Sequence, residues 1–224
     1  MSFETPPEAW PLRHLVLRTP RLELRPDDDA GLDELVAVAY RGVHPPDQMP
    51  FHAPWTDADP RYLGRGMLQH FWQQRSVLAP ESWAVHFLVR FEGRVVGVQT
   101  LRAKDFAGRR AIDSGSWIGM EVQGRGIGTE MRAAVLAFAF DHLGATRAIS
   151  AAFADNTRSL RVSDKLGYRR TGTATVERRD EPTEEVQVAI TPDEFVRPDW
   201  TLTVEGYPAC AGLLGAGQPP NEPA

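Results

Sequence analysis

The pattern of apolar and polar positions divides the first third of the chain into one strand, two helices and a long loop. Residues 16–25 alternate between apolar and polar side chains and predict a single strand. The aspartates at 27–29 supply caps for a helix whose apolar face consists of Leu32, Leu35, Val36 and Ala39. A proline-rich loop over 42–55 follows, and residues 57–78 carry apolar positions at helical spacing.

In the middle of the chain the periodicity changes from strands to a helix at a cluster of glycines. Segments 83–90 and 94–101 alternate on either side of a glycine turn and predict a β-hairpin. A further strand is expected over 113–122. The glycines then open a helix that continues to about Leu143. Its stretch over 133–140 is apolar nearly all round, which predicts a central, buried helix.

Shorter elements complete the chain. They are a strand over 147–154, a helix over 156–166, an antiparallel strand pair over 171–178 and 186–190, a short helix beginning at Thr191-Pro192, and a strand over 201–205. This order of elements predicts an α/β (α+β mixed) protein with a mixed sheet.

Composition and charge narrow the class of protein. The chain has 224 residues, of which 42% are hydrophobic and 25% charged, enough for one domain with a substantial core. A formal net charge of −5 provides no global basic field, so we expect no nucleic-acid partner. The single cysteine, Cys210, excludes an internal disulfide and a cysteine-based zinc cage, and we expect no metal.

The sequence also bears on location in the cell. The N-terminal residues lack a basic region followed by an apolar run, so they do not resemble a signal peptide. The longest apolar run, over 133–140, is far shorter than the ~20 residues that a membrane span needs. A lone cysteine suits a reducing compartment. We therefore expect a cytoplasmic protein with no membrane partner.

The strongest chemical signal is the glycine-rich segment 123–129, which reads Gln-Gly-Arg-Gly-Ile-Gly-Thr between a strand and a helix. Glycines allow a tight turn, and the N–H groups of the turn join the positive end of the helix dipole to form an anion site suited to a pyrophosphate. The alternative is a glycine turn without a ligand. A dinucleotide fingerprint would need a third glycine where Thr129 or Met131 stands, and a P-loop would need a lysine. Asp155, after the next strand, keeps a nucleotide-dependent oxidoreductase open as a weaker alternative.

These residues resemble the GNAT family of N-acyltransferases, whose signature is Gln/Arg-x-x-Gly-x-Gly/Ala. Gln123, Gly126 and Gly128 match it. The segments 19–26, 113–119 and 156–168 further resemble the branch that contains the ribosomal-protein alanine acetyltransferases (RimJ/RimL-like), in the order and spacing of that branch. Shorter segments, including Gly42-Val43-His44 and Lys104-Asp105-Phe106, are similar to a mycobacterial succinyl-CoA-dependent member.

The resemblance implies a GNAT fold: a twisted mixed sheet of about seven strands, helices on both faces, and a splayed central pair formed by the strands at 113–122 and 147–154. The pantetheine of an acyl-CoA would lie between the splayed strands, and its pyrophosphate would sit on the glycine turn. The cofactor-binding residues implied are Trp117, Ile118, Gly119, Gln123, Gly124, Arg125, Gly126, Ile127, Gly128, Thr129, Asn156 and Ser159.

The resemblance also implies direct attack of a primary amine on acetyl-CoA or succinyl-CoA, without a covalent enzyme intermediate. The oxyanion would accept from the backbone N–H of Ile118 or Gly119. Asp113 is the candidate general base, the alternative being a strand-end cap, and Glu121 is the second candidate. Ser163 stands where many relatives place a proton-donating tyrosine, and Ser159 offers a hydroxyl nearby or caps the helix.

The acceptor site is expected around the 42–55 loop, because so long a connection is often functional. Candidate acceptor residues are His44, Phe51 and Trp72, and the histidines His52 and His70 also lie where the family builds its acceptor site. A succinyl carboxylate would be met by Arg102, Lys104 or Gln99. For each of them a structural or solvated role is the alternative. The acceptor, a small molecule or a protein, is left open.

The expected organisation is an N-terminal extension over 1–14, a GNAT acyltransferase domain over 15–200, a C-terminal extension over 201–214 and a disordered tail over 215–224. A homo-oligomer is possible, because the C-terminal segment could pack on the sheet or on another subunit. A non-catalytic acyl-CoA-binding regulatory module of the same fold is the alternative to an enzyme.

Overall fold

The computed structural model describes residues 8–217. The expected disordered tail therefore lies outside the described residues from position 218 onward, and the expected N-terminal extension lies outside them up to position 7. Within the described part of the chain, no helix is both long and apolar enough to cross a membrane.

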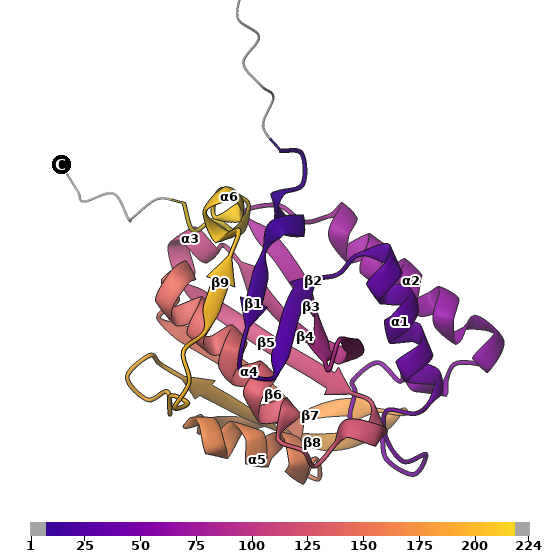
Figure 1. The fold of residues 1–224 in the computed structure, drawn as a ribbon. Coiled ribbons are helices and arrows are strands. Elements are labelled where there is room, and N and C mark those ends of the chain that lie inside the picture. Colours follow the sequence, from indigo (N-terminus) through magenta and orange to yellow (C-terminus); the bar gives the residue numbers. More distant parts are fainter. Residues whose placement is uncertain (1–7, 218–224) are drawn as a thin grey trace, which may run out of the picture.

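One nine-stranded sheet, in the order β7-β8-β6-β5-β4-β3-β2-β1-β9, organises the molecule (Figure 1). Every neighbouring pair in it is antiparallel except β5 and β6, which are parallel. The strands are β1 (Val16–Arg18), β2 (Leu22–Pro26), β3 (Ser82–Phe91), β4 (Arg94–Lys104), β5 (Ala111–Ile118), β6 (Arg147–Phe153), β7 (Arg169–Arg178), β8 (Glu181–Ile190) and β9 (Thr203–Glu205).

The expected number of about seven strands is too low, for two physical reasons. The single strand expected over 16–25 is two strands, because the Thr19 side chain accepts from Leu22 N at 2.9 Å and closes a turn between β1 and β2. The second strand beyond the implied seven is β9, which lies within the strand expected over 201–205 and pairs with β1 at the edge of the sheet. Beyond it, Cys210 and Leu214 are fully buried in the main core, so segment 201–214 packs against the domain.

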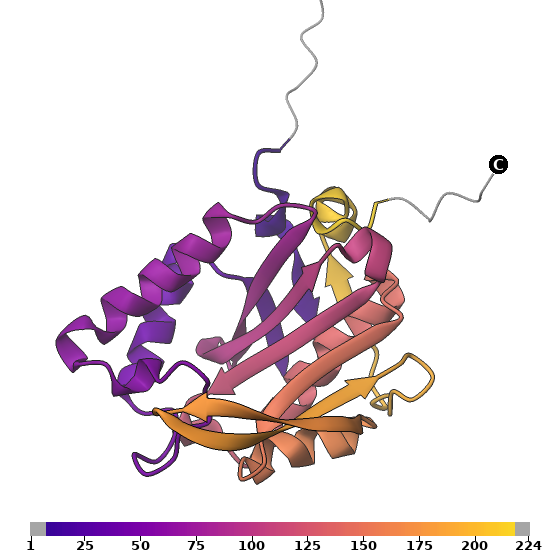
Figure 2. The ribbon, with the colours of Figure 1, turned by 180° about the vertical axis from the view of Figure 1, so that it is seen from behind.

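Helices cover both faces of the sheet (Figures 1 and 2). The helices α1 (Asp29–Tyr40) and α2 (Pro60–Ser76) lie on one face, whereas α4 (Ile127–Phe138) and α5 (Thr157–Leu166) lie on the other; α3 (Phe106–Arg109) and α6 (Tyr207–Cys210) are short. Alternation along β3 separates two cores: Phe87 and Val89 face α4, and Leu88 faces α1 and α2.

The buried helix is confirmed, since every residue from 133 to 140 is buried. After Phe138 the helix widens into a π-helical turn, Ala139–Leu143. The remaining single turns are 3₁₀-helical: Pro11–His14, Trp55–Asp57, Met120–Val122 and Gly212–Leu214. The short helix expected at Thr191-Pro192 is wrong. A turn forms there because the Glu194 carboxylate accepts from Thr191 N at 3.0 Å and Glu194 N donates to Thr191 O.

Candidate functional site: a cleft between two parallel strands

The central strands β5 and β6 separate soon after they begin. They are paired only from Ala111–Arg147 to Asp113–Ile149. The Ser150 hydroxyl donates to Ser114 O at 2.9 Å just beyond the last pair. From there to Ile118 no β5 residue pairs with β6. The expected splay is confirmed, and it opens a cavity of about 910 Å³ between the strands, α5, the 42–55 loop and the glycine turn.

The register of β5 with β4 determines which backbone groups face this cavity. Gly119 N donates to Val96 O at 2.9 Å, so Ile118 and Gly97, which lie opposite each other, form a non-hydrogen-bonded pair. The N–H and C=O of Ile118 therefore point away from β4, toward the splayed side. Those of Ser116, two residues earlier on the strand, point the same way. Of the two expected oxyanion donors, Ile118 N–H faces the cleft and Gly119 N–H is occupied.

The glycine turn forms the far wall of the cavity. Gly124 and Gly126 have φ values of +76° and +80°, which favour glycine over any residue with a Cβ. Gly126 is the N-cap of α4, and no side chain caps that helix. The first-turn N–H groups have no acceptor within the helix and point to where an anion would bind.

An ion pair between the buried Glu130 carboxylate and the partly exposed Arg21 guanidinium holds the turn from behind. Glu130, on the first turn of α4, accepts from Arg21 Nε at 2.7 Å and from the Thr19 hydroxyl at 2.5 Å. Arg21 Nη1 also donates to the backbone oxygen of Arg125 at 3.1 Å. The link was not anticipated from the sequence, although a glutamate within an apolar helix is a signal for a buried partner.

Gln123, expected to contact the cofactor, is committed to protein groups. Its Nε2 donates to Val43 O at 2.8 Å and to Ile118 O at 3.1 Å. Its Oε1 accepts from Arg158 Nη1 at 2.5 Å. The side chain thus joins the 42–55 loop, the end of β5 and α5 at one corner of the cleft.

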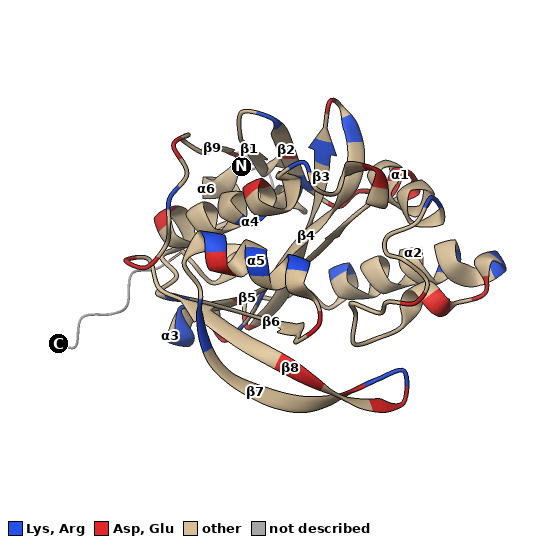
Figure 3. Ribbon diagram, turned by 90° about the horizontal axis from the view of Figure 1, so that it is seen from below, with Lys and Arg blue, Asp and Glu red and all other residues tan. Residues whose placement is uncertain are grey.

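Basic residues line the cleft on the α5 side. Arg158, Arg161 and Lys165 all contribute to the cavity wall, and basic positions follow α5 in Figure 3. Asn156 caps the same helix by accepting from Ser159 N at 3.2 Å, so Asn156, and not the Ser159 hydroxyl considered above, is the capping side chain. Cations at this wall suit the phosphates of a nucleotide.

Asp113, the expected base, lies at the closed end of the splay, where its Cα is still paired with that of Ile149. One of its carboxylate oxygens accepts from both Nε (2.9 Å) and Nη2 of Arg102. The carboxylate is therefore neutralised by a neighbouring guanidinium. Glu121, the second candidate, lies on the surface in an ion pair with Arg41.

A buried guanidinium occupies the floor of the cleft. Arg132, on α4, is only 5% exposed, and burial lowers its pKa. Its Nη1 donates to Ser163 Oγ at 3.1 Å and its Nη2 lies 3.5 Å from Ser116 Oγ. Within the described residues, Nε has no hydrogen-bond partner and no carboxylate forms an ion pair with this side chain. An uncompensated buried cation of this kind favours an anionic ligand group.

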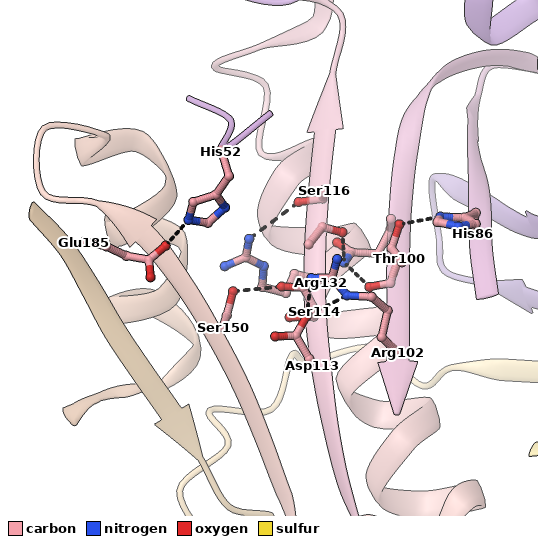
Figure 4. A network of polar contacts seen from close by, with 12 residues as sticks. His52, His86, Thr100, Arg102, Asp113, Ser114, Ser116, Arg132, Ser150 and Glu185 are labelled. Atoms are coloured by element: carbon pink, nitrogen blue, oxygen red, sulfur yellow. Dashed lines mark hydrogen bonds and ion pairs between the residues drawn. The ribbon is translucent and has the colours of Figure 1, made fainter. Parts of the chain in front are cut away.

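A histidine and a glutamate close the side of the cleft next to β8 (Figure 4). His52, on the 42–55 loop, contacts Glu185 Oε1 through Nε2, although the two residues are 133 positions apart. Glu185 is buried, and the His52 ring lies 5.2 Å from the ring of Phe153. Sequence reasoning considered His52 only as one of several histidines and missed Glu185.

A second cavity, of about 420 Å³, lies between α2 and strands β4 and β5. Its wall is rich in aromatic side chains, and the Trp55 ring lies 5.2 Å from Phe51 and 5.3 Å from Trp117. The two cavities share the wall residues Phe51, Arg102, Gly115, Ser116 and Trp117. The two cavities therefore meet at β5, across from the N–H and C=O groups of Ser116 and Ile118.

Two histidines form the polar end of the smaller cavity. Burial, followed by the charges of His70 and Arg102, lowers the pKa of His86 to about 3. Burial and then Arg102 also lower the pKa of His70. His86 Nδ1 is 2.9 Å from Thr100 Oγ1, and its Nε2 has no hydrogen-bond partner among the described residues. Both rings are uncharged near neutral pH.

Of the candidate acceptor residues His44, Phe51 and Trp72, only Phe51 lines the two cavities. Phe51 lines both cavities. His44 instead donates to Pro45 O at 2.8 Å and accepts from Thr56 Oγ1 at 2.7 Å, which holds the loop in shape. Trp72 is half-exposed and donates to Asp29 Oδ1 at 3.0 Å.

The residues expected near a succinyl carboxylate are also divided. Gln99 is fully buried and donates to Gly115 O at 3.1 Å and to Thr100 O at 3.3 Å, behind the cleft. Lys104 lines a separate cavity of about 430 Å³. Arg102 alone of the three reaches the cleft. Among residues 8–217 there is no group of three or more His, Cys, Asp or Glu side chains that could hold a metal ion.

Comparison with known proteins agrees with this geometry. The model of the acetyltransferase (GNAT) domain matches residues 21–169, more than half of the chain. The chain belongs to the GNAT acetyltransferase family. Acetyltransferases of this family take the acetyl group from acetyl-CoA, so the cleft is the site at which this donor is expected.

Solved structures share the fold at low sequence identity. A RimJ protein of Mycobacterium smegmatis in complex with a CoA disulfide is 18% identical with a TM-score of 0.66, covering 90% of this chain and 95% of that one. RimL, a ribosomal L7/L12 α-N-protein acetyltransferase in complex with coenzyme A, is 17% identical with a TM-score of 0.63, covering 79% and 97%. A GCN5-related N-acetyltransferase from Brucella melitensis is 20% identical with a TM-score of 0.62, covering 80% and 79%.

Proposed function

We propose that this GNAT acetyltransferase moves an acetyl or succinyl group from acyl-CoA to a primary amine by direct attack in a ternary complex. The observation that carries the proposal is the splay of β5 and β6, which opens a cavity of about 910 Å³ with the glycine turn as its far wall. An elongated thioester fits between separated strands, because their free backbone groups can bond its amides.

The donor's place follows from the anion site and the strand register. Its pyrophosphate would bind the N–H groups of 124–129, and its pantetheine would run along 117–119. The oxyanion of the tetrahedral intermediate would accept from Ile118 N–H, since that group faces the splayed side. Ser159 and Ser163, on the α5 wall, would lie near the departing thiolate, and the Ser163 hydroxyl accepts from the Arg132 guanidinium.

The acceptor would enter through the smaller cavity and meet the thioester at β5. The aromatic wall formed by Phe51, Trp55 and Trp117 supports an amine that carries an apolar or aromatic group. The amine could belong to a small molecule or to a protein N-terminus, as in the RimL structure. We propose a cytoplasmic location, which fits the single cysteine.

For a succinyl donor, the distal carboxylate would need a cation within the cleft. Arg132 is the buried cation there, and it has unused N–H donors, whereas Lys104 and Gln99 lie outside the cleft. This favours Arg132 over the two residues expected from the sequence, with Arg102 already paired to Asp113.

The first experiment is isothermal titration of the protein with acetyl-CoA, succinyl-CoA, free CoA and NAD. We expect Gly126→Asp to abolish binding of every CoA species, because it places a carboxylate against the pyrophosphate and strains a left-handed position. Gly93→Asp is the matched control: Gly93 also has a positive φ, at +78°, but lies in the β3–β4 turn. Retained CoA affinity in Gly126→Asp would contradict the site, and binding without release of CoA in the presence of amines would favour the non-catalytic alternative.

A further inference from the structure

We infer that His52, held by Glu185, accepts the proton of the attacking amine. The inference rests on the proposed function and deepens it by naming the group that activates the acceptor. Neither residue belongs to the glycine turn or to the strand segment that makes up the donor site.

The two side chains come from segments that only the fold brings together. Glu185 lies on β8 opposite Phe153 of β6, and its carboxylate is buried at the edge of the cleft. His52 reaches it from the 42–55 loop. The loop is tied down on both sides, since Gln123 donates to Val43 O, and Arg179 binds both oxygens of Asp57 at 2.7 Å.

The contact determines which ring nitrogen of His52 can act. A buried carboxylate accepts a hydrogen bond, so Nε2 carries the proton that points to Glu185. The lone pair is then on Nδ1. Figure 4 shows the second ring nitrogen turned away from Glu185, toward the side of the cleft where Arg132 and Ser116 lie. A histidine oriented by a carboxylate is an effective general base.

Position distinguishes His52 from Asp113. The proton must be taken up beside the carbonyl carbon, near the Ile118 N–H that would hold the oxyanion. Asp113 is five strand residues away from Ile118, which is about 16 Å at ~3.3 Å per residue. Its carboxylate is also bound by Arg102. His52 and Asp113 both line the cavity that contains Ile118, so the distance along β5 and the Arg102 contact are what separate the two candidates.

The charged groups around His52 favour a neutral amine. Glu185 faces it from β8 and Arg132 lies on the α4 side of the cleft. On β7, Arg178 lies 4.6 Å from the Phe153 ring that also contacts His52. Arg158, Arg161 and Lys165 contribute further positive charge from α5. These cations disfavour a bound ammonium, while Glu185 compensates the imidazolium that forms when His52 takes the proton.

The step balances without any further reactant. The ammonium loses one proton to His52 Nδ1, which passes it to water, and the freed lone pair forms the C–N bond. The nitrogen of the tetrahedral intermediate then loses a second proton, which reaches the departing thiolate through His52 as the C–S bond breaks with its electron pair on sulfur. His52 then returns to its starting form.

The test uses the full chain with acetyl-CoA, 2-phenylethylamine and an alanine-initiated peptide as probe amines, with CoA release followed from pH 5 to 9. We expect His52→Gln to lower kcat/KM by about 10²–10⁴ and to remove the acid limb of the profile, with acetyl-CoA affinity retained. Added imidazole should partly restore His52→Ala. Asp113→Asn, the matched control, should keep the acid limb.

Glu185 is tested as a positioning residue. Glu185→Gln removes the carboxylate that holds His52 Nε2, so kcat should fall while the affinity for acetyl-CoA is retained, and the conservative variant Glu185→Asp should restore part of the rate. Loss of the acid limb in Asp113→Asn with retention in His52→Gln would overturn the inference and leave the proposed function intact. Failure of the wild-type protein to release CoA with either amine would overturn the proposed function, and the inference with it.

Discussion

The two cavities that meet at β5 differ in the chemistry of their walls. The larger one, between β5 and β6, is lined by backbone groups, serines and four basic side chains of α4 and α5. The smaller one, under α2, is lined by aromatic rings and two uncharged histidines. The first wall suits a long ligand with anionic groups, and the second suits an apolar amine in its neutral form. A single strand therefore separates two environments, each suited to one reactant.

The largest expected effect concerns the support of the larger cavity. Arg21→Ala leaves the Glu130 carboxylate without its cation behind the glycine turn. Because the buried carboxylate loses its charged donor, we expect a loss of about 1–3 kcal/mol in the free energy of unfolding, together with weaker acetyl-CoA binding. Chemical denaturation and calorimetric titration would measure these.

Arg61→Ala is the control for that variant. Arg61 pairs with Asp59 on the surface, where its side chain is 76% exposed. An exposed pair contributes little to stability, so we expect no measurable loss in this variant. Equal losses in the two variants would show that the Arg21–Glu130 pair has no special role in holding the turn.

The charge of the larger cavity can be changed while the packing around it is kept. Arg132→Met removes the buried guanidinium but keeps an unbranched apolar chain. If the donor is succinyl-CoA, we expect its Kd to rise about tenfold to a hundredfold, since a hydrogen bond to a charged group contributes about 1.5–3 kcal/mol, and the Kd of acetyl-CoA to change much less. Lys104→Met is the control, because Lys104 lies outside the cleft. An equal rise in the Kd of both donors would assign Arg132 to the thioester end of the ligand instead.

The uncharged His86 at the polar end of the smaller cavity makes the free energy of unfolding depend on pH. The pKa of His86 is about 3 in the folded protein, below its ordinary value of 6.5, so the unfolded chain binds the proton more readily. The contribution of the neutral His86 to the free energy of unfolding is fully present above pH 6.5 and is lost as the pH falls toward 3. The loss is roughly 2 kcal/mol between pH 6.5 and 5. Thermal unfolding of wild type and His86→Gln should show this loss only in the wild type. His14→Gln, at an exposed histidine, should keep the wild-type dependence.

Much of the donor side could be predicted from the sequence because its features are local. The glycine turn, the strand before it and the buried helix after it are contiguous, so periodicity and the conformational freedom of Gly124 and Gly126 were enough to predict an anion site. The division of residues 16–25 into two strands was missed, because the Thr19 hydroxyl closes a turn that alternation alone does not reveal.

The acceptor side was predicted less well, since its residues depend on distant partners. His44 and Trp72 looked suitable by type, yet their hydrogen bonds hold the loop and join α2 to Asp29. Lys104 was chosen by its place beside the hairpin, and the strand carries it to another cavity. Arg132 was overlooked because a basic residue in an apolar helix is ordinarily assigned to the solvent face.

The sequence by itself determined most of the order of strands and helices, the glycine turn predicted to bind an anion, and the resemblance that implied a splayed strand pair. These depend on interactions within a few residues or on motifs in register. Only the tertiary structure decided that Arg132 points into the cleft, that β9 joins β1, and that His52 meets Glu185 across 133 residues. Such contacts arise when the whole sheet and its two cores are assembled, because burial and register, rather than local preference, bring those side chains together.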